Sequence, residues 1–111
     1  MTHIANKPWG YEELLRHNIK ILHILKGKRL SLQYHKDKEE FIVCLVGLCE
    51  FELGNIKGVL VPGGYLFIPK LMKHRLSATT NDVELFEVFD GVPTEVVRLE
   101  DDYGRIECVD G

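Results

Sequence analysis

Short apolar runs separated by turn-forming residues fill the chain from residue 19 to residue 99. The runs have the length of β-strands and recur about every 8 to 12 residues, a spacing typical of an all-β sandwich or barrel. Glycine, asparagine and aspartate stand between the runs, and these residues suit the backbone conformations of tight turns. The pattern predicts strands over residues 19–26, 29–35, 40–46, 48–53, 58–61, 65–68, 73–78, 83–89 and 93–99.

Residues 11–16 fit two different elements. Tyr11, Leu14 and Leu15 share one face of a helix, but the same segment also fits a first strand. No repeat, low-complexity tract or linker divides the 111 residues, and this length is usual for one compact domain. We therefore expect a single domain over residues 1–111, all-β with little helix.

Residues 40–46 are apolar on both faces of the expected strand. Ile42 and Cys44 point to one side, and Phe41, Val43 and Leu45 point to the other, whereas a half-exposed strand alternates apolar with polar residues. We expect both faces to be buried. Because the interior of a small barrel covers one face, the second needs a covering sheet or another subunit, and a homodimer is the expected assembly.

Charge and composition narrow the partners and the compartment. Lysine and arginine are scattered among the acidic residues, with a net charge of -3, so we expect no nucleic-acid partner. No apolar stretch approaches the roughly 20 residues that span a bilayer, and the N-terminus shows no signal pattern, so we expect a cytoplasmic protein without membrane contact. Cys44, Cys49 and Cys108 lack CxxC spacing, which predicts reduced thiols.

Four polar residues are predicted to meet inside the barrel. Gln33 and His35 are two apart on one strand, so their side chains share a face. A turn over residues 36–38 lets Glu40 face them from the next strand, and His74 follows the end of another strand. Two imidazoles, a carboxylate and an amide oxygen suit a divalent metal ion such as Zn, Fe, Mn, Co or Ni. The alternative is a pair of hydrogen-bonded scaffold histidines.

The spacing of these residues resembles the two motifs of the cupin family. The matching positions are Gly27, Gln33, His35, Glu40 and Gly47 for the first motif, and Gly63, Pro69 and His74 for the second. Two positions depart from the second motif, because Leu71 stands where the family usually has glycine and Ala78 where it usually has asparagine. The resemblance implies a cupin barrel, which is a double-stranded β-helix or jelly roll.

Three further segments resemble the phosphomannose isomerase branch of the cupins. They are Lys-Pro-Trp-Gly-Tyr-Glu at 7–12, Arg-Leu-Ser-Leu-Gln-x-His at 29–35 and Arg-Leu-Glu-Asp-Asp-Tyr-Gly-Arg at 98–105. The match covers residues 7 to 105 in the correct order. It implies one divalent metal, with zinc as the first choice, on the positions of Gln33, His35, Glu40 and His74.

Other charged residues are candidates for the reaction itself. Arg98 and Arg105 suit a sugar phosphate, because guanidinium groups match phosphate oxygens, although ion pairs with residues 100–102 fit equally well. Arg29 is expected to share the face of Gln33 and to line the pocket. Glu87 lies in the middle of an apolar strand, where a carboxylate is costly unless it is paired or functional, so it is a candidate acid or base.

The resemblance implies an aldose-ketose isomerase that acts on a phosphorylated sugar such as mannose 6-phosphate. A non-catalytic cupin that binds a sugar or another metabolite is the first alternative. A non-haem iron oxygenase is the second, because two histidines and one carboxylate also form the facial triad of those enzymes. Gln33 as a fourth ligand argues against the oxygenase.

Overall fold

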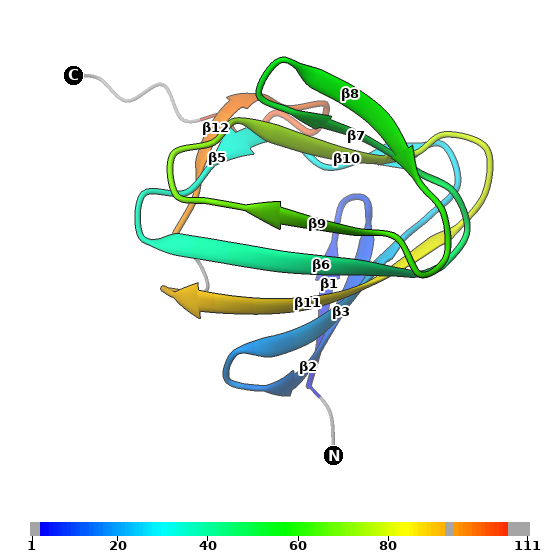
Figure 1. Ribbon diagram of the computed structural model, residues 1–111, viewed down its shortest axis with the longest axis horizontal. Helices are drawn as coiled ribbons and strands as arrows, with labels where there is room; N and C mark the ends of the chain where they lie inside the picture. The colour runs from blue at the N-terminus through cyan, green and yellow to red at the C-terminus, as the bar shows by residue number, and fades with distance from the viewer. Residues whose placement is uncertain (1–2, 93–94, 107–111) are drawn as a thin grey trace.

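The structure, a computed structural model, describes residues 3–92 and 95–106, and every element in this part of the chain is a β-strand. Two antiparallel sheets face each other (Figure 1). One has the order β1-β2-β3-β11-β6-β9 and the other β12-β5-β10-β7-β8, with β4 beside β10. The strands are β1 His3–Lys7, β2 Gly10–Arg16, β3 Ile19–Ile24, β4 Lys28–Arg29, β5 Leu32–Tyr34, β6 Lys38–Val46, β7 Cys49–Leu53, β8 Ile56–Leu60, β9 Tyr65–Ile68, β10 His74–Ala78, β11 Val83–Gly91 and β12 Val97–Glu100. The expected all-β barrel is confirmed.

The segment that fitted either a helix or a strand is a strand. Residues 11–16 belong to β2, which pairs with β1 and with β3, so the helical alternative is wrong. Gly10 begins this strand at a φ of +152°, and a Cβ there would meet the His23 carbonyl oxygen at 1.9 Å. The close pairing of β2 with β3 therefore requires glycine at this position.

Two other expectations are changed in detail. The strand expected over 29–35 is broken, because Leu30 and Ser31 lie between β4 and β5. The last strand is β12, and residues 93 and 94 of the segment expected there lie outside the described residues, as does Cys108. Cys44 and Cys49 are buried free thiols, and burial raises the pKa of Cys49 to about 12.

The interior has an apolar end and a polar end. The inward-facing residues of the neighbouring strands β3, β11 and β6 are apolar at one end and charged at the other. At one end, Leu22 of β3 and Cys44 of β6 both pair with Leu85 of β11. At the other end, Glu87 pairs with Lys20. Within the described residues, the apolar end holds most of the buried hydrophobic core, so the polar end is free to form a site.

The outer face of the first sheet is also apolar. The strand register places two rows of apolar residues across β3, β11, β6 and β9: Ile19, Val88, Phe41 and Phe67 in one row, and Ile21, Phe86, Val43 and Tyr65 in the next. We call these eight residues the outer apolar face. Phe41 is 40% exposed and Phe67 is 52% exposed. In a single chain the outer face of residues 40–46 is therefore partly exposed, and the expected burial of this face depends on another subunit.

No helix in the described part of the chain is long and apolar enough to cross a membrane.

Candidate metal centre

His35, Glu40 and His74 converge at the polar end of the barrel. His35 follows β5, Glu40 lies in β6, and His74 begins β10, where it pairs with Gln33. Glu40 Oε1 lies 2.9 Å from His35 Nε2 and 3.3 Å from His74 Nε2. All three side chains are buried, and one ligand atom from each lies within 4.8 Å of the others. The sequence prediction that these three residues meet is therefore correct.

Hydrogen bonds fix which nitrogen of each imidazole faces the centre. His35 Nδ1 donates to the Glu95 carbonyl oxygen at 2.6 Å, and His74 Nδ1 donates to the Met72 carbonyl oxygen at 2.9 Å. A carbonyl oxygen accepts and never donates, so each neutral ring has its proton on Nδ1 and a lone pair on Nε2.

The three inward atoms form a set of electron-pair donors that a cation between them would stabilise. Both Nε2 lone pairs face Glu40 Oε1, which is buried without a hydrogen-bond partner. Three electron-pair donors at such short distances repel one another unless a metal ion or an additional proton lies among them. Two imidazoles and a carboxylate are a common donor set for zinc and other first-row divalent ions, so the residues fit a metal.

Gln33 lies beside this cluster with its amide nitrogen turned inward. Its Nε2 lies 3.4 Å from His35 Nε2, and its Oε1 accepts a hydrogen bond from Ser31 Oγ at 2.5 Å. An amide coordinates a metal through its oxygen, so ligation by Gln33 requires the amide group to turn over. The hydroxyl of Ser31 can accept as well as donate, and it fits both orientations of the amide.

Two carboxylates and two lysines extend the polar layer. Lys38 Nζ lies 3.5 Å from Glu40 Oε2 and 3.6 Å from Glu87 Oε2, and Lys20 Nζ lies 3.5 Å from the same Glu87 oxygen. Lys20 also donates to Glu12 at 3.1 Å. All of these contacts lie inside or at the mouth of the barrel, so the metal cluster is continuous with a network of buried charges.

The two inner carboxyl groups have opposite pKa displacements. Burial raises the pKa of Glu87 well above its usual range, and the charge of Glu40 adds to this effect, while Lys38 and Lys20 oppose it. Burial acts in the same direction on Glu40. The opposing effects, of which hydrogen bonding to Glu87 is the largest and the charge of Lys38 is another, outweigh burial and hold the pKa of Glu40 well below its usual range. Glu87 is thus the protonated member of the pair, and Glu40 is the charged one.

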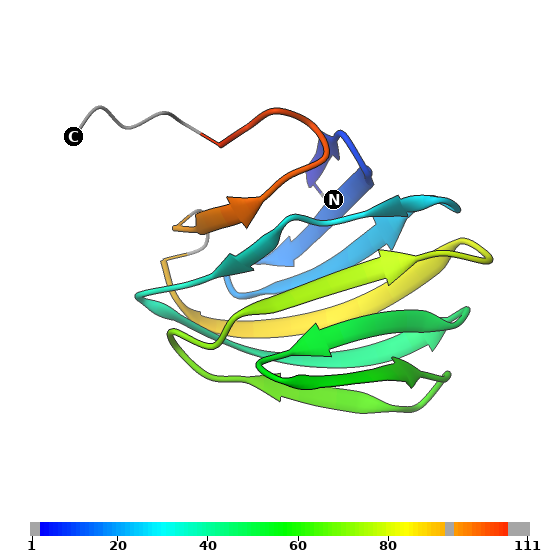
Figure 2. The same cartoon turned by 90° about the horizontal axis from the view of Figure 1, so that it is seen from above.

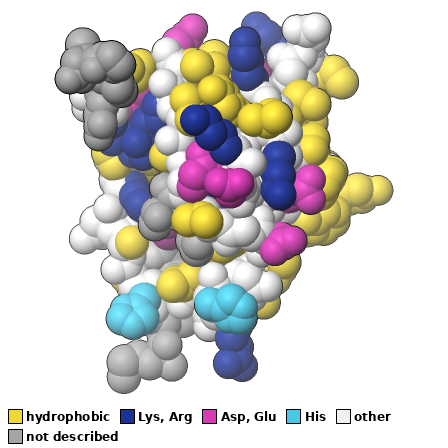
Figure 3. Space-filling model, turned by 90° about the vertical axis from the view of Figure 1, so that its left-hand side faces the viewer, with side chains coloured by type: hydrophobic (Ala, Val, Ile, Leu, Met, Phe, Trp, Pro, Cys, Tyr) yellow, Lys and Arg dark blue, Asp and Glu magenta, His cyan; other side chains and the backbone are white. Residues whose placement is uncertain are grey.

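A pocket of about 310 Å³ lies next to the metal cluster. Its wall is formed by the β1–β2 hairpin and by residues from the segment 95–105, which lie on the same side of the molecule (Figure 2). Trp9, Leu30 and Phe89 contribute apolar surface. Five cationic side chains line the pocket: Lys7, Lys20, Lys38, Arg98 and Arg105. Viewed from the side in Figure 3, the surface shows acidic and basic side chains close together in the upper half. Among the described residues of the lining, the five cations outnumber the two carboxylates, Glu12 and Glu95, so the pocket suits an anionic ligand.

The lysines are the residues that sequence reasoning missed. Lys20 alternates with Leu22 and Ile24 on the inward face of β3, and Lys38 alternates with Glu40 and Ile42 on that of β6. The two-residue alternation of each strand could have predicted that these lysines point into the barrel.

The structure brings Arg98 and Arg105 to the pocket but not Arg29. Arg105 also forms a bidentate ion pair with Asp101, with distances of 2.9 and 3.0 Å. Arg29 lies outside the barrel and pairs with Asp102 at 2.7 and 2.9 Å. The expectation that Arg29 lines the pocket is wrong, because the break at Leu30 and Ser31 interrupts the alternation on which it rested.

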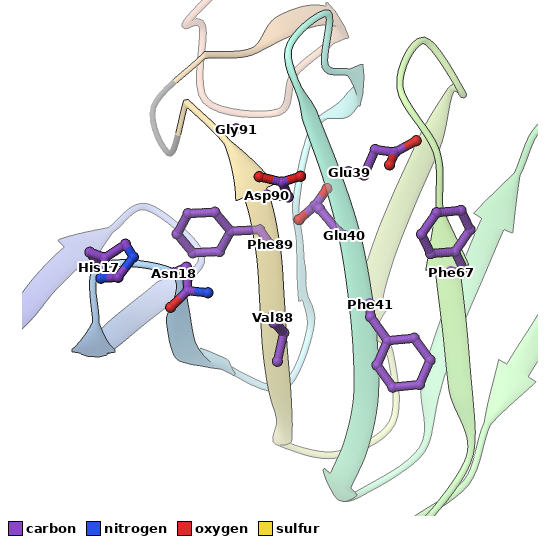
Figure 4. A pocket seen from close by; sticks show the side chains of 10 residues that line it. All are labelled: His17, Asn18, Glu39, Glu40, Phe41, Phe67, Val88, Phe89, Asp90 and Gly91. Carbon is purple, nitrogen blue, oxygen red and sulfur yellow. The ribbon is translucent and has the colours of Figure 1, made fainter.

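A second hollow, of about 590 Å³, lies on the outside of the first sheet (Figure 4). Phe41, Phe67 and Val88 of the outer apolar face line it, together with Glu39 and Asp90. Glu40 also lines this groove, although its carboxylate contacts His35 and His74 on the inner side of the sheet. The groove concerns the apolar surface and not the chemistry of the site.

Facing antiparallel sheets with two histidines and a glutamate at one end of the interior define a cupin. The sequence matches the model of the family described as mannose-6-phosphate isomerase C-terminal over residues 1–107, and the chain belongs to this family.

Curated relatives share between 29% and 40% of their aligned residues with this chain. The xanthan biosynthesis protein XanB of Xanthomonas campestris is 31% identical in an alignment of 107 positions that covers 89% of this chain and 23% of XanB. The alginate biosynthesis protein AlgA of Pseudomonas aeruginosa is 29% identical over 89% of this chain and 22% of its own length. The chain thus spans under a quarter of these two relatives. Protein SchB of Streptomyces halstedii is 40% identical over 63 residues, 57% of this chain and 45% of SchB.

Solved structures with low sequence identity share the fold. The capsular polysaccharide assembling protein CapF of Staphylococcus aureus has a TM-score of 0.76 at 13% identity, over 90% of this chain and 34% of CapF. KdgF from Halomonas sp. has a TM-score of 0.72 at 18% identity, over 81% of this chain and 88% of KdgF. These similarities support the cupin barrel independently of the family match.

Proposed function

We propose that this chain is a metal-dependent cupin that isomerises a phosphorylated sugar between its aldose and ketose forms, with mannose 6-phosphate as the first substrate to test. The single observation that carries the proposal is the position of the His35, Glu40 and His74 cluster beside a pocket with five cationic side chains. A sugar phosphate has the two features that this arrangement suits: oxygens for a metal and an anion for lysine and arginine.

His35, Glu40 and His74 would hold the metal, with Gln33 as a fourth ligand after its amide turns over. Zinc is our first choice, because imidazole and carboxylate are its usual ligands. A divalent ion at this position polarises the carbonyl and the adjacent hydroxyl of a bound sugar.

Lys38 and Glu87 would carry out the proton transfer. Lys38 lines the pocket and also contacts Glu87, while Glu87 is 2% exposed and does not line it. A proton exchanged with the substrate at Lys38 Nζ can therefore pass to or from the Glu87 carboxyl group. Because burial raises the pKa of Glu87 well above its usual range, this carboxyl group holds a proton that it can give to Lys38.

Arg98 and Arg105 would bind the phosphate. Both line the pocket, and guanidinium groups bind phosphate oxygens in a bidentate manner. Arg105 is held in place by Asp101, which leaves less side-chain entropy to be lost on binding.

The test is a metal-reconstitution assay. Protein stripped with a chelator is loaded separately with zinc, cobalt, nickel, manganese or ferrous iron and given a panel of aldose phosphates, each beside its unphosphorylated sugar. We expect conversion of at least one phosphorylated sugar by at least one metal form, and none by the His35→Ala variant. Absence of turnover in every combination would overturn the isomerase proposal.

A non-catalytic sugar-binding cupin is the second candidate. The burial of Glu87 behind Lys20 and Lys38 favours this candidate. Among the described residues that line the pocket beside the metal cluster, neither Glu40 nor Glu87 is present, so neither carboxyl group reaches a bound sugar directly. A sugar phosphate that binds the metal-loaded protein and is recovered unchanged would support this candidate over the isomerase.

We further propose that two copies of the chain pair through the outer apolar face. The patch spans four strands without a charged residue in either row, and exposed patches of this kind mark interaction surfaces. Eight apolar side chains provide on the order of several hundred Å², which approaches the roughly 800 Å² per partner of a standard interface. A second copy brings an identical apolar surface to the contact, as a twofold interface requires.

A further inference from the structure

Glu95 holds the turn that carries His35 in two ways. Its carbonyl oxygen accepts the hydrogen bond from His35 Nδ1 at 2.6 Å. Its carboxylate oxygen Oε1 accepts hydrogen bonds from the backbone N–H groups of Lys36 at 2.6 Å and Asp37 at 2.9 Å. One residue thus binds both the imidazole of His35 and the two backbone groups that follow it.

The same turn is held by backbone contacts on both sides. Leu71 N donates to the His35 carbonyl oxygen at 2.7 Å, and Val92 N donates to the Asp37 carbonyl oxygen at 3.0 Å. These contacts fix the path of the turn but touch no imidazole atom. The direction and the protonated nitrogen of the His35 ring depend on the carbonyl of Glu95.

His74 provides an internal comparison. Its Nδ1 donates to the carbonyl of Met72, two residues away on the same segment, so its ring is oriented locally. The partner of His35 is 60 residues away in sequence. That distant carbonyl stays in place because the Glu95 side chain is itself bound to the turn it orients.

We infer that Glu95 is a positioning residue for the metal centre, which keeps the His35 proton on Nδ1 and its Nε2 lone pair directed at the metal position. This inference rests on the proposed function, since it assigns His35 as a metal ligand. Groups that orient a ligating histidine typically change metal affinity by 10- to 100-fold when they are removed. Glu95 also lines the pocket and leads into β12, so the residue that orients the ligand is joined to the strand that carries Arg98.

The test compares variants that keep or remove the hydrogen-bond acceptor. Glu95→Gln retains one side-chain oxygen, which can accept both backbone N–H groups without the charge. Glu95→Ala removes the acceptor, and Glu95→Met removes it at nearly the original side-chain length, in case the alanine variant does not fold. Glu52→Ala is the matched control, because Glu52 lies on β7 and pairs with the exposed Lys57 at 3.7 Å, away from the metal cluster.

Two readouts are independent of activity. The imidazole nitrogen shifts of His35 and His74 are measured by NMR in the metal-free protein at a pH where both rings are neutral, and metal affinity is measured by titration. In the wild type, the Glu95→Gln variant and the Glu52→Ala control, we expect His35 protonated on Nδ1 and affinities within about threefold of each other. In Glu95→Ala or Glu95→Met we expect His35 to shift toward Nε2 protonation, His74 to remain unchanged, and metal affinity to fall about tenfold or more.

An unchanged His35 tautomer in a folded Glu95→Ala or Glu95→Met variant overturns the inference, as does a glutamine variant as impaired as the alanine one. Failure of the proposed function is a separate result. A wild-type protein that binds no divalent metal removes the metal centre, while the tautomer measured in metal-free protein still decides whether Glu95 orients His35.

Discussion

Glu40 and Glu87 lie on adjacent strands with the ammonium group of Lys38 within 3.6 Å of both, and their pKa values are displaced in opposite directions. Two neighbouring buried carboxyl groups cannot easily both be charged, so one keeps a proton. Here the proton belongs to Glu87, and the charge stays on the carboxylate that faces the two histidines. The pair thus separates the acid-base role from the ligand role.

Replacing Glu87 by glutamine tests this separation. An amide resembles a protonated carboxyl group in shape and charge, so Glu87→Gln should leave the Glu40 site and its metal affinity intact. It removes the exchangeable proton, and kcat for the sugar phosphate should fall by about 10²- to 10⁴-fold. Metal content and steady-state kinetics of the same preparation measure both effects. Unchanged kcat would exclude Glu87 from proton transfer.

Loss of either inner histidine should remove most of the metal. His35→Ala and His74→Ala each delete one ligand nitrogen, whereas His17 lies at the outer groove and its replacement should have no effect. Binding to the native state raises the free energy of unfolding by about 2.7 kcal/mol when the ligand is present at 100 times its Kd. Melting curves with and without zinc should therefore shift for the wild type and His17→Ala. A similar shift in all three histidine variants would reject these ligands.

The sequence was sufficient to predict the fold and the convergence of His35, Glu40 and His74, because both depend on regular alternation. Glu40 and His35 were placed together by a two-residue period and one turn, and the structure retains both features. The prediction that Arg29 lines the pocket was wrong because the strand breaks at Leu30 and Ser31, and neither residue type indicates a break. The burial of Lys20 and Lys38 was not predicted, because a lysine on a strand is usually solvated. Their burial depends on carboxylate partners from other strands.

The pocket role of Arg105 can be separated from its ion pair by comparison with Arg29. Each arginine forms a bidentate pair with an aspartate, but the pocket is lined by Arg105 and not by Arg29. Hydrogen bonds to charged groups contribute about 1.5–3 kcal/mol, so Arg105→Ala should raise KM for a phosphorylated sugar by roughly 10- to 100-fold. Arg29→Ala should leave it unchanged. Equal KM values for the two variants would place the phosphate elsewhere.

Leu71 stores backbone strain close to the metal ligands. Its φ is +69°, a left-handed conformation that costs a residue with a Cβ roughly 1–2 kcal/mol. The side chain is 65% exposed, so little apolar burial offsets this cost. Leu71→Gly should therefore raise the free energy of unfolding by about 1 kcal/mol, measured by urea denaturation with an unchanged m value. Leu99→Gly, in strand β12 at a residue without a positive φ, should lower it instead. A destabilised Leu71→Gly variant would contradict the strain argument.

The outer apolar face gives a prediction about assembly that does not depend on the site. Phe41 and Phe67 pair directly across β6 and β9, at the centre of the exposed part of this face. In a twofold dimer each substitution occurs twice, so Phe67→Lys would bury two ammonium groups without partners, a cost of several kcal/mol per ion. We expect the wild type to have a dimeric mass by light scattering at micromolar concentration and Phe67→Lys to have a monomeric one.

Val59→Lys is the matched control for the dimer, because Val59 is 53% exposed on β8 in the other sheet. A lysine there adds the same charge to the chain without touching the outer apolar face, so this variant should remain dimeric. Dissociation by both variants would point to net charge instead of the face itself. A monomeric wild type would leave the eight apolar residues facing water and would contradict the proposed pairing.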